Sequence, residues 1–301
     1  MLRYDILVFM SNFTTSSALK GILLMFCSSI AYAVSSACVR FLADDFSIFQ
    51  LVLFRTAIGT MVMLPWLFSS GLGVLRTKRW KLYLFRACTV YVSNLTWFYA
   101  LSRMNLAEAT ALSFLMPLVA ALILAIWLRE KLGWERLFAI ALGFLGAVLI
   151  IRPGFIEVGS EIYAVMFTVL MYGSATAIIR ALTLTENPNV VVFYMFFLNL
   201  PLALGPGVMT WSTPQAADLP VILLFGLASW VAQVFMTRSL ACGEAAVVFP
   251  AFYFQLPATA LLGFALFGQI PSLWIVPGAI LIIGGSYFSV WSENRRRQSV
   301  S

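Results

Sequence analysis

Histidine is absent from this 301-residue chain, and only 10% of its residues are charged. Without histidine the chain can build neither a histidine proton relay nor a histidine-ligated metal site. A soluble domain has about 25% charged residues, so the low charge predicts a chain embedded in a membrane along most of its length. Its four cysteines, Cys27, Cys38, Cys88 and Cys242, show no paired spacing, which favours small buried side chains. No cofactor is predicted.

Long apolar segments take the place of the missing charge, since 62% of the residues are hydrophobic. The turns between these segments are short, which leaves no room for a soluble domain. In lipid each segment must satisfy its own backbone polar groups, so segments of this length are helices. The sequence therefore predicts an all-α integral membrane protein with ten transmembrane helices. The predicted segments are 19–39, 47–68, 82–101, 107–128, 137–151, 163–179, 190–204, 221–237, 245–267 and 274–291.

The positive charges indicate the orientation. If the N-terminus is cytoplasmic, most of the 19 Lys and Arg residues fall in cytoplasmic turns, and Arg40, Arg103 and Arg152 are left outside. This bias predicts that residues 1–17 and the basic tail 293–301 are both cytoplasmic. The basic residues are scattered over turns and tail, which fits topology and contact with anionic lipids and does not fit nucleic-acid binding. The sequence leaves open whether Met1 or Met10 is the start.

The two halves of the chain resemble each other. Tyr32 is followed by Arg40 at the same spacing at which Tyr172 is followed by Arg180. Five helices per half is an odd number, so the second copy must enter the membrane from the opposite side. Such inverted-topology repeats are typical of secondary transporters with a binding site near the middle of the membrane. The predicted repeats are residues 18–153 and residues 157–292.

Local motifs carry a family resemblance that covers about residues 18–292. The first half contains Ala107-Glu-Ala-Thr-Ala-Leu, Pro117, Glu130-Lys-Leu-Gly-Trp and Arg152-Pro-Gly, and the second contains Gly243-Glu-Ala, Pro250 and Phe267-Gly-Gln-Ile-Pro271. These motifs resemble the two EamA domains of the drug/metabolite transporter superfamily. Its members export amino acids and other metabolites or import nucleoside-derived cofactors and vitamins. One departure is Gln269, where the second repeat usually carries Glu.

Arg55 is the charged residue that the sequence places deepest in the membrane, about 12 Å from the outer surface. A charge at that depth costs at least about 2.5 kcal/mol, so it usually faces a cavity or a partner. No carboxylate lies at comparable depth, which favours a role in binding a carboxylate of the substrate. A structural arginine that is bonded to helix carbonyls, or whose side chain extends outward to the membrane surface, is the alternative. Arg86 lies only about one turn inside its helix, so we expect it to extend to the cytoplasmic surface.

Polar and aromatic residues of helices 1, 3, 4, 6, 8 and 9 are further candidates for substrate binding, and the resemblance implies that these helices line a central cavity. Tyr91, Asn94 and Trp97 are spaced to share one helical face. Amides can hydrogen-bond a zwitterion, and rings offer stacking or cation–π contact. The candidates are Tyr32, Ser35, Tyr91, Asn94, Trp97, Ser113, Tyr172, Trp230, Gln233, Phe252, Tyr253 and Gln255.

Two acidic residues begin equivalent helices of the two repeats. Glu108 opens the fourth segment and Glu244 opens the ninth. Asn105 with Glu108 fits a capping box, and acidic residues suit a helix N-terminus. The alternative is that one of the two carboxylates binds a proton or the substrate at the mouth of a cavity, and a facilitator without a coupling ion is equally admissible.

Small residues and prolines point to packing and bending. Gly143, Gly146 and the pair 284–285 allow close backbone approach, either between the repeats or across a dimer interface. Pro117 and Pro250, together with Pro257, can bend the fourth and ninth segments.

The leading prediction is a bacterial inner-membrane transporter that exports a small amphoteric, carboxylate-bearing metabolite, namely an amino acid, a derivative or an opine-type metallophore. The alternative is an importer of a cationic or aromatic cofactor-like metabolite, of the S-adenosylmethionine or riboflavin type. A membrane enzyme would need a convergent catalytic set, which scattered acids without histidine do not provide. A structural or sensory protein would show no substrate flux. The expected partners are the metabolite and membrane lipids, with no nucleic acid, and the chain is a monomer or a homodimer.

Overall fold

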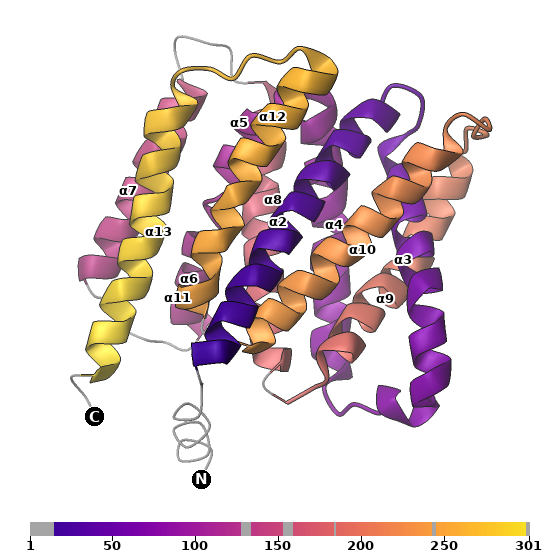
Figure 1. The fold of residues 1–301 in the computed structure, drawn as a ribbon, viewed down its shortest axis with the longest axis horizontal. Coiled ribbons are helices and arrows are strands. Elements are labelled where there is room, and N and C mark those ends of the chain that lie inside the picture. The colour runs from indigo at the N-terminus through magenta and orange to yellow at the C-terminus, as the bar shows by residue number, and fades with distance from the viewer. Residues whose placement is uncertain (1–14, 128–133, 153–158, 184, 243–244, 299–301) are drawn as a thin grey trace.

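The computed structural model describes residues 15–127, 134–152, 159–183, 185–242 and 245–298, and these residues form a bundle of helices without strands (Figure 1). Six helical segments are long and apolar enough to span a membrane, and three others are shorter apolar helices. The prediction of an all-α membrane protein is therefore confirmed. The helices are α2 Thr15–Leu42, α3 Ile48–Ser70, α4 Trp80–Arg103, α5 Leu106–Ser113, α6 Met116–Trp127, α7 Trp134–Ile151, α8 Ser160–Thr183, α9 Pro188–Met209, α10 Leu219–Cys242, α11 Ala245–Val248, α12 Gln255–Phe267 and α13 Ile275–Gln298, with the 3₁₀ turns η1 Leu72–Leu75 and η2 Phe249–Phe254.

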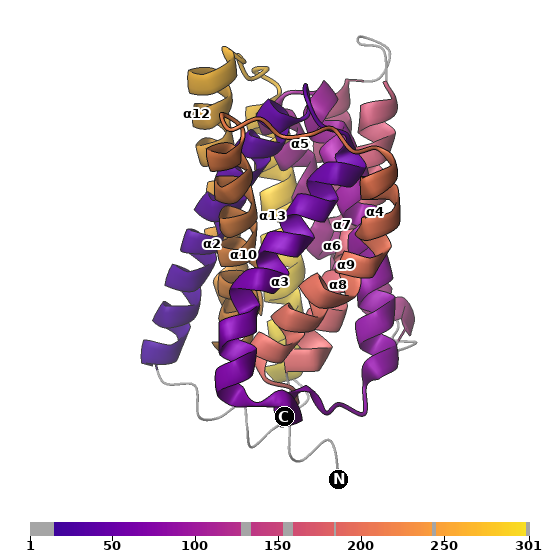
Figure 2. The same ribbon diagram turned by 90° about the vertical axis from the view of Figure 1, so that its right-hand side faces the viewer.

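The helices pair in a pattern that two copies of one unit would produce. α2 packs against α10 as α8 packs against α4, and α12 packs against α2 as α6 packs against α8. The pairs α7–α13 and α3–α9 join equivalent helices of the two halves and lie on opposite flanks of the bundle (Figures 1 and 2). An inverted repeat about a two-fold axis requires that each helix pair has such a counterpart in which the helices of the two halves are exchanged.

The start of α2 and the end of α13 lie at the same end of the bundle, which we call the terminal end (Figure 1). The sequence predicts that this end faces the cytoplasm. α3 and α4 are joined at the terminal end by η1, where the Tyr194 hydroxyl of α9 donates to the Leu75 carbonyl at 2.7 Å and Thr77 donates to Glu186 at 2.7 Å. At the opposite end, the Gln50 side chain donates to the Ser212 carbonyl at 2.6 Å and accepts from its N–H at 2.9 Å.

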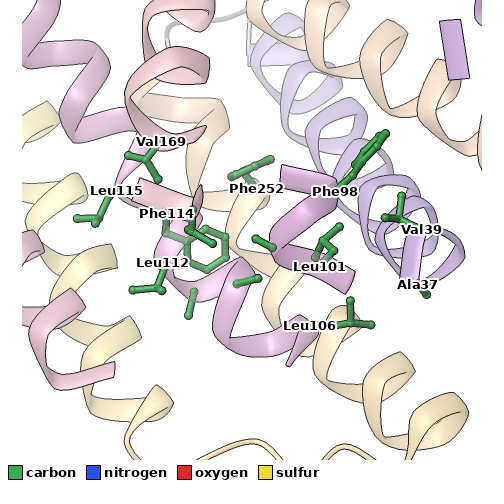
Figure 3. Close-up of a cluster of buried hydrophobic side chains, with 14 of the residues drawn as sticks. Ala37, Val39, Phe98, Leu101, Leu106, Leu112, Phe114, Leu115, Val169 and Phe252 are labelled. Atoms are coloured by element: carbon green, nitrogen blue, oxygen red, sulfur yellow. The ribbon is translucent and has the colours of Figure 1, made fainter. Parts of the chain in front are cut away.

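The fourth and ninth spans are both broken, as the prolines predict. Between α5 and α6 the chain makes tight turns, in which Phe114 N–H bonds to Ala111 and Leu115 N–H bonds to Leu112. The ninth span has the 3₁₀ turn η2 between α11 and α12. Phe114 and Phe252, one from each break, face each other in the buried core with ring centroids 6.0 Å apart (Figure 3). The breaks of the two halves therefore meet near the middle of the molecule.

Glycines bring α7 and α13 into close contact. A Cβ at Gly146 would lie 2.5 Å from the carbonyl oxygen of Gly278, and one at Gly285 would lie 2.6 Å from that of Ala139. Gly284, by contrast, has nothing within 4 Å of its Cβ position. Of the two roles that the sequence left open for these glycines, the structure shows packing between the two halves at Gly146 and Gly285, whereas Gly143 faces Leu118 of its own half.

Candidate functional site

A central cavity lies where the two helix breaks meet the middle of α2, α3, α4 and α8, and it encloses about 780 Å³ of space not filled by atoms, including the part that opens outward. The broken spans contribute Ser113 and Met116 on one side and the segment 249–255 on the other. Backbone that leaves helical geometry at membrane depth is tolerated where it lines such a cavity. Nine of the residues singled out from the sequence line it: Tyr32, Ser35, Arg55, Asn94, Trp97, Ser113, Tyr172, Phe252 and Gln255.

Tyr32 and Tyr172, which the repeat predicts to be equivalent, meet inside the protein. Their hydroxyl oxygens lie 3.1 Å apart, and both hydroxyls lie within hydrogen-bonding distance of the side-chain oxygen of Gln233, at 3.1 and 3.3 Å. The Gln233 amide nitrogen in turn donates to the Thr237 hydroxyl at 3.2 Å. Gln233 itself does not line the cavity, but its side-chain oxygen lies within hydrogen-bonding distance of two residues that do.

Arg55 is buried in the cavity wall with only 4% of its surface exposed. Its guanidinium carbon lies 5.5 Å from the centroid of the Phe196 ring, a cation–π contact that compensates part of the cost of burial. Within the described part of the chain, Nη1 of Arg55 has no hydrogen-bond partner. Its electrostatic neighbours are the Tyr172 and Tyr32 hydroxyls, and no carboxylate is among them. The arrangement leaves a positive charge available to the cavity.

Two buried amides also have free polar atoms. Asn94 and Gln255 line the cavity, and the Asn94 amide nitrogen and the Gln255 amide oxygen have no hydrogen-bond partner among the described residues. One is a donor and the other an acceptor. The cavity wall thus contains one amide donor and one amide acceptor that no described residue satisfies.

Besides Gln233, three predicted residues lie away from the cavity wall. Tyr91 lies about one turn nearer the terminal end of α4 than Asn94 and packs against the main hydrophobic core. Trp230 packs against the hydrophobic cluster that contains Phe196. The Tyr253 ring is directed toward Phe114, with centroids 4.9 Å apart.

Nine other residues of the wall were missed from the sequence. A helical period would have revealed most of them, because Ser36 and Val39 follow Tyr32 by about one and two turns, and Thr168 and Thr176 flank Tyr172 by about one turn on either side. Short hydroxyl side chains in an apolar helix carry little signal of their own, since they can bond to their own backbone. The missed residues are Ser36, Val39, Ser93, Phe98, Met116, Thr168, Thr176, Met236 and Phe249.

The prediction for Arg86 is wrong. Its side chain does not extend to the surface and is only 1% exposed, because α9 covers it and the Val191 carbonyl accepts a hydrogen bond from Nη1 at 2.9 Å. Sequence distance from the helix end was a poor measure of depth here, since α4 begins at Trp80 and the neighbouring α9 closes over it.

Of the two acidic candidates, Glu108 does not lie in the cavity wall. Glu108 lies half-buried at the opposite end, close to Asn105 and Arg152. The capping box is not formed, because the Asn105 side chain accepts no hydrogen bond from α5, and the Leu106 N–H donates at 3.0 Å to Gln269 of the α12–α13 loop instead. Glu244 lies outside the described residues.

Comparisons with known proteins agree with this architecture. The "S-adenosylmethionine uptake transporter" of Rickettsia prowazekii is 22% identical over 96% of this chain and 98% of its own. The "Riboflavin transporter" of Rhizobium johnstonii is 29% identical over 94% and 95%. The "Pseudopaline exporter CntI" of Pseudomonas aeruginosa is 24% identical over 88% and 93%. A solved crystal structure matches 94% of this chain and 99% of its own, with a TM-score of 0.65 at 18% identity, which shows the fold.

These relatives are bacterial and cover nearly the whole chain, which together with the apolar helices indicates a multi-pass protein of the inner membrane. A family model described as the EamA-like transporter family matches residues 19–152. Residues 19–152 therefore belong to the EamA-like transporter family, and the predicted relationship of the chain to EamA-type drug/metabolite transporters is confirmed.

Proposed function

We propose that this protein exports a small amphoteric metabolite with a carboxylate, such as an amino acid, a derivative or an opine-type metallophore, by alternating access of the central cavity. The observation that carries the proposal is Arg55, a buried cation in the cavity wall without a carboxylate neighbour among the described residues. A substrate carboxylate supplies the missing counter-charge. α6 and α12 begin at this cavity, and the positive ends of their dipoles favour an anion there as well.

The free amide atoms of Asn94 and Gln255 complete the proposed site. The Gln255 oxygen accepts from the amino group of a zwitterion, and the Asn94 nitrogen donates to its carboxylate. Trp97 offers a ring to the side chain of the substrate. One of the relatives is named an exporter of pseudopaline, which supports the direction of transport proposed.

Import of a cationic or aromatic cofactor-like metabolite is the second candidate. It is favoured by relatives named for uptake of S-adenosylmethionine and for riboflavin, and by Trp97, Phe98 and Phe252 in the cavity wall. In that case stacking is the dominant contact, and replacement of Arg55 is tolerated.

The test compares cells with and without the protein by mass spectrometry of retained and secreted metabolites. We expect a carboxylate-bearing compound to accumulate inside cells that lack the protein. Arg55→Gln should weaken the apparent affinity for that compound about tenfold or more, because a charge-assisted hydrogen bond is lost. A fully active Arg55→Gln variant at normal membrane levels would rule out the carboxylate role and favour the second candidate.

A further inference from the structure

Arg86 of α4 is a second buried cation, and the site proposed above makes no use of it. Its side chain is 1% exposed, and Nη1 donates to the Val191 carbonyl of α9. Nε and Nη2 have no hydrogen-bond partner in the described part of the chain. Leaving the donors of a buried cation unsatisfied is costly, so a purely structural arginine held by one carbonyl is a poor explanation of this residue.

Arg86 lies on the same helix as the cavity residues Ser93 and Asn94 but nearer the terminal end. On α4 it precedes Ser93 and Asn94 by about two turns, which places it about 11 Å nearer the terminal end, and the helical period puts it on the same face as Ser93. Tyr32, Tyr172 and Arg55 are within electrostatic range of its guanidinium group. Arg86 is therefore nearer the terminal end than the cavity residues of α4 and within electrostatic range of the tyrosine pair.

The surroundings of Arg86 contain no described carboxylate that compensates its charge. The groups that act on it are the hydroxyls of Tyr172, Tyr32 and Tyr83 and the guanidinium of Arg55. Glu186 acts on Tyr83 but is bonded to Thr77 at 2.7 Å. Among the described residues, the buried cations Arg55 and Arg86 therefore both lack an acidic partner, and both lie within electrostatic range of the tyrosine pair.

We propose that Arg86 is a second anion-binding residue of the transport path, which takes over the acidic group of the substrate when the path opens toward the terminal end. The proposal rests on the proposed function, in which Arg55 binds that group when the cavity faces the opposite end. When the Tyr32 and Tyr172 hydroxyls separate, the substrate can move between the position at Arg55 and the position at Arg86. The substrate anion is then never without a cation during its passage.

The test measures half-saturating concentrations separately at the two faces of the membrane. Right-side-out and inverted membrane vesicles containing the full chain receive a ¹³C-labelled small-molecule extract of bacterial cells at increasing concentrations, and mass spectrometry records which compounds enter. A tag at the C-terminus identifies the face of the terminal end. The variants are Arg86→Gln, Arg86→Lys and Arg55→Gln. The matched control is Arg103→Gln, because Arg103 stacks on Tyr99 at 4.5 Å outside the cavity.

We expect Arg86→Gln to raise the half-saturating concentration about tenfold at the terminal-end face and less than about twofold at the opposite face, as the loss of a charge-assisted bond in one state predicts. Arg86→Lys should show a smaller rise at the same face, and Arg103→Gln none. Equal changes at both faces, or no change, would overturn the proposal. If Arg86→Gln fails to reach the membrane, Arg86→Lys decides by the same comparison. The proposed function fails separately, if the entering compounds have no acidic group or Arg55→Gln changes nothing.

Discussion

The hydroxyls of Tyr32 and Tyr172 form the contact at which the two halves of the chain meet in the cavity. Each tyrosine comes from the equivalent helix of its half, and both share the side-chain oxygen of Gln233. A pair of identical side chains from equivalent helices presents the same chemical group from either half. It is therefore suited to breaking and re-forming while the halves exchange roles.

We expect Tyr32→Phe and Tyr172→Phe each to destabilise the protein by about 0.6 kcal/mol, the average for side-chain hydrogen bonds inside membrane proteins. The double variant should lose less stability than the two single variants together, because both changes remove the same hydrogen bond. Thermal unfolding of the purified protein in detergent measures both effects. Tyr163→Phe is the control, since Tyr163 is 66% exposed. Strictly additive losses would show that the two hydroxyls are not coupled.

The position of a single residue could be predicted where burial of its side chain in an apolar segment has a high energetic cost. A charge deep in an apolar segment is expensive, so Arg55 stood out in the sequence, and the structure places it in the cavity wall. Tyr91, Trp230 and Tyr253 lie away from the wall because aromatic side chains also suit the packed core, and helical spacing alone does not separate the two environments. Arg86 was misplaced because depth depends on which neighbouring helix covers a residue.

At the scale of the helix, the α7–α13 contact depends on glycine. We expect Gly146→Ala to destabilise the protein by about 1–3 kcal/mol, because the added methyl group would force the backbones apart. Gly284→Ala is the matched control, since its Cβ would meet nothing within 4 Å and alanine favours the helix by about 1 kcal/mol. Unfolding in detergent compares the two variants. Equal stability of both would contradict the close backbone approach.

The start of α5 depends on a residue from the other half of the chain. Gln269 accepts the hydrogen bond of the Leu106 N–H at 3.0 Å, where Asn105 makes no cap. We expect Gln269→Ala to cost about 1 kcal/mol, as the loss of a helix cap does, and Gln269→Glu to keep the bond because it retains the acceptor oxygen. Thermal unfolding distinguishes the variants. If both variants unfold like the unmodified protein, Gln269 does not anchor α5.

The breaks in the fourth and ninth spans show which features of an element can be predicted. Proline removes a backbone donor, so a bend near Pro250 followed directly from the sequence. The 3₁₀ turn η2 and the contact between Phe114 and Phe252 did not, because they depend on how the two breaks pack against each other.

At the scale of the whole molecule, the described carboxylates lie away from the cavity. Glu108 is half-buried at the opposite end, near Asn105 and Arg152. We therefore expect transport in proteoliposomes to follow the substrate gradient and to be unchanged by an imposed pH gradient. Glu108→Gln should transport at the same rate. Acceleration by a proton gradient that is lost in Glu108→Gln would establish this carboxylate as the coupling group.

The architecture was the most predictable level. Apolar segments indicated ten helices, and an odd number of helices in each half required inversion of the second half, which the exchange of helix pairs bears out. The partner of each helix could not be predicted, because apolar faces in a membrane resemble one another and only the assembled bundle selects among them.

The bonds on the α3–α9 flank affect the route that a substrate can take. α3 and its adjoining turns are tied to the α9 side at both ends, by Gln50 with Ser212 at one end and by Tyr194 with Leu75 at the other. The glycine contact of α7 and α13 closes the other flank. Because both of these flanks are joined in the described part of the chain, we expect a solute to enter and leave along the membrane normal and not between the helices of either flank. Transport should then follow the concentration of the solute in water and not its solubility in the bilayer.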